Sequence, residues 1–227
     1  MRTRTLIAAC SLSAASLAVP AHAKEDTQLW LTGATNVKLS DKLRLSEELI
    51  ARFSDDRNGL YELENNLLLG YVVAPKVTVW GGYTHAPLYS AGRFIQMEHR
   101  AREQVTFDNI AKLGPGTLSV RMRFEQRWRE GLPGTAWRMR PYIRYAVPIA
   151  NHGKTTLNLS HESFVNLNKV AFQKASGEDR MRNMIAIRTP LSKQLGLEVG
   201  YLNQYTLVRG GENRSDHIAT LGLTLSL

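Results

Sequence analysis

The sequence predicts an all-β fold, an antiparallel transmembrane β-barrel of about 10–12 strands, and three observations predict it. Apolar and polar residues alternate through long segments with the two-residue period of a β-strand. Several segments run 11 to 14 residues, whereas soluble strands average roughly 5–6 and a tilted membrane strand needs about 9–11. The joints between segments alternate between short turns and longer polar loops, which is the layout of an outer-membrane barrel with short periplasmic turns.

The composition is compatible with such a barrel. The 227 residues carry a formal charge of +9, are 43% hydrophobic and have a mean hydropathy of −0.26. A membrane barrel can give a soluble-looking average, because its lipid-facing and lumen-facing residues alternate and cancel. No uninterrupted apolar run approaches the roughly 18 residues of a transmembrane helix.

The N-terminus has the pattern of a cleaved signal peptide over residues 1–23. A positive "MRTR" precedes the apolar "TLIAACSLSAASLAVP", and "AHA" fits a small-residue cleavage site. We expect export and a mature chain, residues 24–227, that forms a single barrel domain in the outer membrane of a Gram-negative bacterium. Cleavage would remove Cys10, the only cysteine, and the loss of Arg2 and Arg4 would lower the formal charge from +9 to +7. A mature chain without a thiol has no disulfide and no thiolate metal site.

Eleven alternating segments follow the leader. We place them near residues 27–37, 42–54, 60–73, 77–86, 98–110, 117–129, 135–147, 154–166, 180–189, 194–207 and 217–227. The turns "LSDK", "VAPK", "KLGPG", "PIANHGK" and "LSKQ" alternate with the expected outer loops "SDDRNG", "LYSAGRFIQM", "EGLPG", "NKVAFQKASGED" and "RGGENRSD". Bacterial single-chain barrels have an even number of strands. We therefore expect ten or twelve strands, with one segment misassigned or outside the wall.

The stretch "SVRMRFEQRWREG" indicates what the barrel encloses. Its charged residues occupy one face of a strand, and Val120, Met122, Phe124 and Trp128 occupy the other. We expect the apolar face to meet lipid and the charged face to line the lumen. The same alternation elsewhere predicts a lumen charge ladder, with Asp108 as a further inward acid: Arg44, Glu48, Arg52, Glu62, Glu64, Arg100, Arg102, Arg121, Arg123, Glu125, Arg127, Arg129, Arg138, Arg140, Arg144, Glu162, Arg182, Arg188 and Glu198.

Aromatic residues fall near the ends of the expected strands, where outer-membrane barrels place girdles at the two membrane surfaces. We expect the girdles to contain Trp30, Tyr61, Tyr71, Trp80, Tyr83, Trp128, Trp137 and Tyr145.

Seven motifs in a fixed order resemble one family. They are "QLWLTG", "LSEELIARF", "LLLGYVVAPKVTVWGGY", "RMRFEQRWRE", "WRMRPYIRYAVP", "HESFVNLN" and "RMRNMIAIRTPLSKQLGLEVGYLNQY", and they cover nearly all of residues 28–205. The chain resembles the uncharacterised bacterial family catalogued as domain of unknown function 2490. The resemblance implies an outer-membrane barrel with no established activity.

The predicted lumen suggests two functions that do not require catalysis. Arginine–carboxylate pairs make rigid bidentate contacts, so the ladder can fill a small barrel and serve a structural role. An arginine surplus can instead line a narrow, porin-like passage or pocket that favours small anions. In the first case, Arg123→Glu or Arg140→Glu is expected to destabilise the barrel. The expected partners are outer-membrane lipid, small anions, and the barrel-assembly and periplasmic chaperone machinery.

An enzyme remains as a third alternative, although we expect no enzyme. In "LSHESF", His161 and Ser163 are two residues apart and share the lipid-facing side near the outer rim. This pair resembles outer-membrane phospholipase A, where a serine and a histidine oriented by an asparagine attack acyl esters. Asn166 and Asn168 follow in the sequence, but Asn166 has the opposite facing. His161 and Ser163 are therefore the candidate catalytic residues.

Other functional classes fit the sequence poorly. The arginines lie within strands across the whole chain, so we expect no nucleic-acid partner. The six histidines lack metal-ligand spacing, and no phosphate-binding loop or GxGxxG motif is present, so we expect neither a metal nor a cofactor. A soluble periplasmic binding module is a further alternative, but it would leave the apolar stripes in water.

Overall fold

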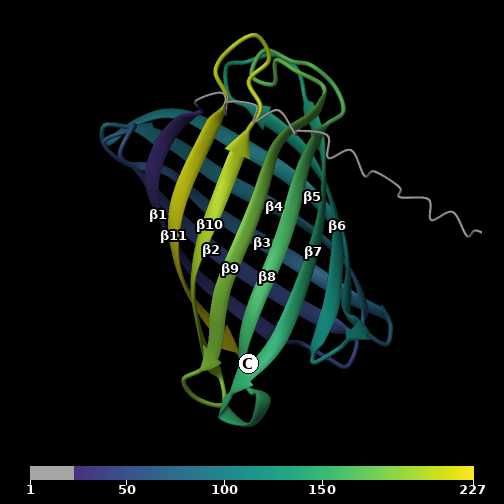
Figure 1. The fold of residues 1–227 in the computed structure, drawn as a ribbon. Coiled ribbons are helices and arrows are strands. Elements are labelled where there is room, and N and C mark those ends of the chain that lie inside the picture. Colours follow the sequence, from purple (N-terminus) through teal and green to yellow (C-terminus); the bar gives the residue numbers. More distant parts are fainter. Residues whose placement is uncertain (1–22) are drawn as a thin grey trace, which may run out of the picture.

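The computed structural model describes residues 23–227 and is a closed barrel of eleven strands (Figure 1). The predicted leader, residues 1–23, lies outside the described residues except for Ala23. The strands are β1 (Lys24–Lys38), β2 (Leu43–Ser54), β3 (Gly59–Ala74), β4 (Val77–Ser90), β5 (Arg93–Leu113), β6 (Gly116–Arg129), β7 (Ala136–Ala150), β8 (Thr155–Asn166), β9 (Gly177–Pro190), β10 (Leu195–Thr206) and β11 (Arg214–Ser226). Helical structure in the described part of the chain is limited to one short 3-10 turn, η1 (Asn151–Gly153). The predicted all-β barrel is confirmed.

A parallel strand pair closes the barrel. Each strand pairs antiparallel with its sequence neighbours, and β1 then pairs parallel with β11 over the register from Lys24↔Arg214 to Asn36↔Ser226. The expectation of ten or twelve strands is therefore wrong, because all eleven segments lie in the wall. A parallel ladder satisfies backbone donors and acceptors as an antiparallel one does, so an odd strand number leaves no open edge.

The parallel pair puts the two ends of the barrel chain at opposite ends of the barrel. Strand β1 starts at the end that carries the longer loops, and β11 finishes at the other end among the short turns (Figure 1). The short-turn end contains residues 39–42, 75–76, 114–115, 151–154 and 191–194. The loop end contains residues 55–58, 91–92, 130–135, 167–176 and 207–213.

One predicted outer loop is mostly strand. The stretch "LYSAGRFIQM" was expected to be irregular, but β4 runs on to Ser90 and β5 starts at Arg93. The chain reverses at Ala91 and Gly92, both with positive φ, which is the left-handed geometry of a two-residue hairpin. The loop end is consequently uneven, with long segments only at residues 130–135, 167–176 and 207–213.

The exterior of the barrel is a band of apolar side chains. Outward positions alternate with buried inward ones along each strand, and the large apolar residues among them are exposed in the isolated chain. No helix within residues 23–227 is long and apolar enough to cross a membrane. The exposed band includes Leu29, Leu49, Leu67, Leu69, Val79, Ile143, Leu159, Ile185, Ile187, Val199, Leu221 and Leu223.

Three of the predicted girdle aromatics face the interior instead. The Trp30 ring packs beneath two guanidiniums. The Tyr61 hydroxyl donates to Oε1 of Gln28 at 2.8 Å, because a register shift in the β2–β3 ladder turns Tyr61 inward. The ring of Trp80 packs over Gly70, where a Cβ would lie 2.6 Å from it. The other predicted aromatics are outward: Tyr71, Tyr83, Trp128, Trp137 and Tyr145.

A cysteine pair can test the parallel closure. Leu29 and Ala219 are register partners with outward side chains, so Leu29→Cys with Ala219→Cys should form a disulfide on mild oxidation. The chain from Lys24 onward contains no other cysteine. Leu29→Cys with Leu223→Cys is the control, because Leu223 lies four residues further along β11, about 13 Å away. Equal cross-linking of both pairs, read from gel mobility, would rule out this register.

Candidate functional site

Five buried glutamates form the centre of the lumen. They come from β3, β5, β6 and β8, and each lies within ion-pair distance of two or more arginines. Alternation along each strand aims these side chains inward, and barrel curvature brings them together from strands far apart in sequence. The five are Glu62, Glu64, Glu98, Glu125 and Glu162.

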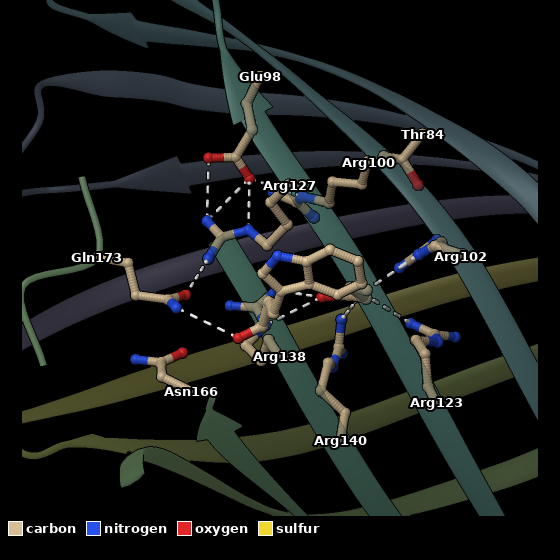
Figure 2. A network of polar contacts seen from close by, with 12 residues as sticks. Thr84, Glu98, Arg100, Arg102, Arg123, Arg127, Arg138, Arg140, Asn166 and Gln173 are labelled. Atoms are coloured by element: carbon tan, nitrogen blue, oxygen red, sulfur yellow. Dashed lines mark hydrogen bonds and ion pairs between the residues drawn. The ribbon is translucent and has the colours of Figure 1, made fainter. Parts of the chain in front are cut away.

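Glu98 anchors the network towards the loop end. Arg127 donates to it through two nitrogens, with Nε 3.0 Å from Oε1 and Nη2 3.0 Å from Oε2 (Figure 2). Nε of Arg129 lies 2.7 Å from Oε2, and Nε of Arg100 lies 2.7 Å from Oε1. Forked contacts of this kind fix the orientation of a guanidinium more tightly than a single bond does.

Glu62 and Glu64 on β3 share two arginines. Nη2 of Arg100 lies 2.6 Å from Oε1 of Glu62, and its Nη1 lies 2.9 Å from Oε2 of Glu64. Arg52 from β2 contacts the same two carboxylates. Two carboxylates this close would repel each other without cations between them, so the arginines hold the pair together.

Glu125 and Glu162 continue the network towards the short-turn end. The Glu125 side chain is 0% exposed and accepts from Nε of Arg138 at 3.0 Å and from Nη1 of Arg140 at 2.8 Å. Nη2 of Arg140 also lies 2.8 Å from Oε2 of Glu162, so this one guanidinium bridges two carboxylates. Arg102 links Glu125 to Glu64, which makes the network continuous.

Aromatic rings contact several of the lumen arginines, which outnumber the glutamates. Ten arginines from β2, β5, β6, β7 and β9 contact only five glutamates. Phe164 is 1% exposed, and four guanidiniums lie 4.3–5.5 Å from its ring centre. The Trp30 ring centre lies 4.4 Å from the guanidinium of Arg52 and 4.6 Å from that of Arg182, which also contacts Phe164. Aromatic faces attract cations, so these rings offset part of the like-charge repulsion.

The network divides the lumen into two cavities. One, of about 360 Å³, extends towards the short-turn end and reaches Arg188 and Thr224. The other, of about 460 Å³, extends towards the loop end and reaches Arg57 and Arg214. Arg52, Glu64, Arg140 and Arg182 line both cavities, and all four are buried. We call these four residues the waist of the lumen.

The loop over residues 167–176 folds into the mouth of the larger cavity. Nη1 of Arg127 donates to Oε1 of Gln173 at 3.4 Å (Figure 2). Nε2 of Gln173 donates to the backbone oxygen of Asn168 at 2.9 Å. Phe172 lies beneath the guanidiniums of Arg127 and Arg129. The loop is therefore tied to the charge network beneath it.

Several residues of the predicted ladder lie outside the network. Arg44 donates to backbone oxygens of the 39–42 turn and of Leu43. Glu48, Glu198 and Arg188 line the smaller cavity but form no ion pair within residues 23–227. Arg144 donates to Oγ of Ser119 at 3.4 Å. Asp108 is exposed at the short-turn end, where the β5–β6 register shifts between Phe107 and Ala111.

Sequence reasoning missed some residues of the network. Glu98 has the same facing as Arg100 and Arg102, so the alternation already contained the signal for it. Arg180, half-buried against Phe164, was detectable in the same way. Trp30 carried no such signal, because an alternation that assigns large apolar residues to the lipid side does not predict an aromatic ring among arginines.

A separate polar cluster lies on the exterior, on β8 and β9. Nε2 of His161 lies 3.1 Å from Oγ of Ser163, and Nδ1 of His161 lies 2.8 Å from Oδ1 of Asn183. Asn183 was not among the expected residues. It is the register partner of His161 on the next strand, a relation that only strand pairing supplies.

The two asparagines that the sequence suggested bond elsewhere. Nδ2 of Asn166 lies 2.7 Å from Oδ2 of Asp179, and Nδ2 of Asn168 lies 2.8 Å from the backbone oxygen of Thr135. In the part of the chain that the structure describes, no group of three or more His, Cys, Asp or Glu residues is arranged to hold a metal ion.

Comparison with known proteins decides the family. The model of the family described as "Protein of unknown function (DUF2490)" matches residues 27–215. This chain belongs to the DUF2490 family. The resemblance inferred from the seven motifs is thereby confirmed.

Two similar proteins add context to the DUF2490 assignment. An uncharacterized protein of Methylorubrum extorquens is 26% identical over 230 residues, which cover 97% of this chain and 96% of that protein. A solved structure described as outer-membrane expressed OmpT of Vibrio cholerae aligns with a TM-score of 0.40 and 11% identity. That alignment covers 72% of this chain and 55% of the other.

Two register partners in the lumen should differ sharply in their contribution to stability. Arg140 bridges Glu125 and Glu162, whereas Arg123, opposite it on β6, has one 3.8 Å contact with Glu125 and lies among Arg102 and other cations. Arg140→Gln should lower the free energy of unfolding by about 3–5 kcal/mol, since it leaves buried carboxylates short of a partner. Arg123→Gln should cost much less. Urea unfolding of both variants in detergent checks this, and equal losses would contradict the bridging role.

Phe164 should contribute more to the free energy of unfolding than the burial of its apolar ring alone would. Phe164→Leu removes the ring that four guanidiniums share, and we expect it to lower the free energy of unfolding by about 2–4 kcal/mol. Phe124→Leu is the matched control, because Phe124 is outward and packs against Trp137. Similar unfolding midpoints for the two variants would show that the cation–aromatic contacts add little.

Proposed function

We propose that this DUF2490 protein is an exported outer-membrane β-barrel with a closed lumen and a structural, non-conducting core. The exposed apolar exterior supports the membrane location, because a band of this extent requires a lipid environment. Strands of 12 to 21 residues are long enough to span an outer membrane when tilted. Strand β1 begins at Lys24, the residue that follows the proposed cleavage site, which supports removal of residues 1–23.

The waist is the observation that supports a closed lumen. A solute crossing the barrel would have to pass Arg52, Glu64, Arg140 and Arg182, which separate the two cavities. Moving any of these side chains breaks charge-assisted hydrogen bonds in a buried site, and separating such pairs leaves uncompensated charge. The contacts around the waist therefore resist opening.

The orientation follows from the turns. Outer-membrane barrels place short turns in the periplasm and longer loops outside. We therefore assign the short-turn end, with the end of β11, to the periplasm and the start of β1 to the outer surface. The outward leucines of β11 form an apolar final strand, which suits recognition by barrel-assembly and periplasmic chaperone machinery.

The charge surplus supports a second candidate function, a restricted path for small anions. Both cavities are lined by more arginines than acidic side chains. Arginine in a confined passage favours anions over cations. Such a path would require rearrangement of the waist, and the first candidate is preferred because the waist is buried.

Planar-bilayer recording separates the two candidates. Refolded residues 24–227 should be electrically silent, because the waist closes the lumen. Arg182→Ala should produce discrete openings, since Arg182 is the waist residue with the longest carboxylate contact, 3.8 Å to Glu162, and its removal widens the waist at least cost in pairing. Arg188→Ala, near the rim of the smaller cavity, is the matched control and should stay silent.

Heat-modifiable gel mobility would establish that each sample is folded before recording. Steady openings of the unmodified protein would contradict the closed-lumen proposal. Anion selectivity in a salt gradient would then favour the restricted path for small anions. Silence of Arg182→Ala would show that the closure extends beyond the waist.

A further inference from the structure

We propose that the lipid-facing side of β8 and β9 carries a serine esterase site that hydrolyses acyl esters of membrane lipids. Ser163 is the nucleophile, His161 the general base, and Asn183 the residue that positions the histidine. The proposal rests on the membrane location argued above and is independent of whether the lumen is open.

The hydrogen bonds fix the tautomer that the chemistry needs. Oδ1 of Asn183 can only accept, so Nδ1 of His161, 2.8 Å away, carries the proton. Nε2 is then free to accept from the Ser163 hydroxyl, 3.1 Å away. A nucleophile hydrogen-bonded to a base, with a third group orienting that base, is the arrangement that activates serine in hydrolases.

The strands hold the three groups rigidly. Ser163 follows His161 by two residues on β8, so both side chains point out of the same face. Asn183 lies directly opposite His161 on β9. None of the three depends on a loop, and a site built on paired strands keeps its geometry without ligand.

An apolar groove lies against this cluster. It has a volume of about 490 Å³ and is lined by His161 and Asn183 together with Leu159, Ile185 and Tyr201. Ile185 is 46% exposed and belongs to the apolar exterior band, so the groove is continuous with the lipid-facing surface. The occupant that this continuity fits is the acyl chain of a bilayer lipid.

The position along the strand suits an ester. Ser163 lies three residues before the end of β8 at the loop end of the barrel, while Leu159 and Ile185 lie further towards its middle. A lipid with its headgroup at this rim would place its ester bonds near Ser163. Its acyl chain would then run along the groove towards the centre of the membrane.

Other polar pairs on the exterior differ in chemistry. His99 contacts the Tyr83 hydroxyl, and Nδ1 of His217 lies 2.6 Å from the Tyr201 hydroxyl. Both pairs combine a histidine with the hydroxyl of a tyrosine, which is a far weaker nucleophile partner for a base than a serine in an acyl-transfer site. Within residues 23–227, the hydrogen bonds give only His161 both a serine hydroxyl at one ring nitrogen and an amide oxygen at the other.

The reaction balances with water as the second substrate. Oγ of Ser163 attacks the ester carbonyl carbon as Nε2 of His161 takes the hydroxyl proton. The bond from the acyl carbon to the alcohol oxygen then breaks, and the lysolipid leaves with that proton. Water attacks the acyl-serine, His161 takes its proton, and the fatty acid leaves as the proton returns to Ser163.

The test measures fatty-acid release from phosphatidylethanolamine in mixed micelles and labelling by a fluorophosphonate probe. The folded protein, residues 24–227, should hydrolyse the lipid and be labelled at Ser163. Ser163→Ala and His161→Ala should each lower hydrolysis by about 10³-fold or more, and Ser163→Ala should abolish labelling. Ser119→Ala is the control and should keep full activity, because Ser119 is a buried, inward serine on β6 that does not line the groove.

A separate experiment tests whether Asn183 positions His161 or only packs against it. Asn183→Ala should reduce hydrolysis at least tenfold, whereas Asn183→Asp, which keeps an acceptor oxygen, should restore most of it. Asn65→Ala is the control, because Asn65 is an asparagine on the exterior of β3 that bonds to Glu47, away from the groove. Equal effects of the two alanine variants would reduce Asn183 to a packing residue and overturn its role.

Flotation with liposomes, run on the same samples, separates this proposal from the membrane proposal. Protein that floats but releases no fatty acid and takes no label overturns the esterase site and leaves the membrane location intact. Protein that hydrolyses soluble p-nitrophenyl butyrate through Ser163 but does not float supports the catalytic residues and overturns the lipid substrate. Full activity of Ser163→Ala would overturn the site.

Discussion

Pairing between guanidinium and carboxylate groups inside a narrow barrel is the constraint on which the rest of the structure depends. Alternation along the strands fixes which residues enter the lumen, and once inside they have little water to solvate them. Glu125 is fully buried, and the burial of its charge is tolerated because Arg102, Arg138 and Arg140 surround it. The strand register must therefore be held closely, since a shift of one residue would place these charges on the apolar exterior of the barrel.

Aromatic rings as well as carboxylates stabilise the positive charges of the lumen arginines. Phe164 and Trp30 present their faces to guanidiniums of the network, and the loop that carries Phe172 and Gln173 extends the same arrangement to the mouth. Shape and charge are consequently set together: the rings fill space and also stabilise the cations beside them.

Much of the fold was accessible from the sequence, because strand alternation is a local property that each segment carries by itself. The facing of Arg123, Glu125 and the other ladder residues followed from that period alone. Three things did not follow. The parallel closure is a relation between the two ends of the chain, the inward turn of Tyr61 depends on a register shift, and the approach of Asn183 to His161 depends on strand pairing. Each of these requires knowledge of which residues lie opposite each other.

The odd strand number limits how such a barrel can be related to others. A wall that grows by whole hairpins gains two strands at a time and keeps both chain ends on one side of the membrane. Eleven strands cannot be reached from an even barrel by that route, because the change must involve an odd number of strands, and β1 and β11 then meet in parallel. Ancestry by simple hairpin duplication is therefore insufficient to account for this architecture.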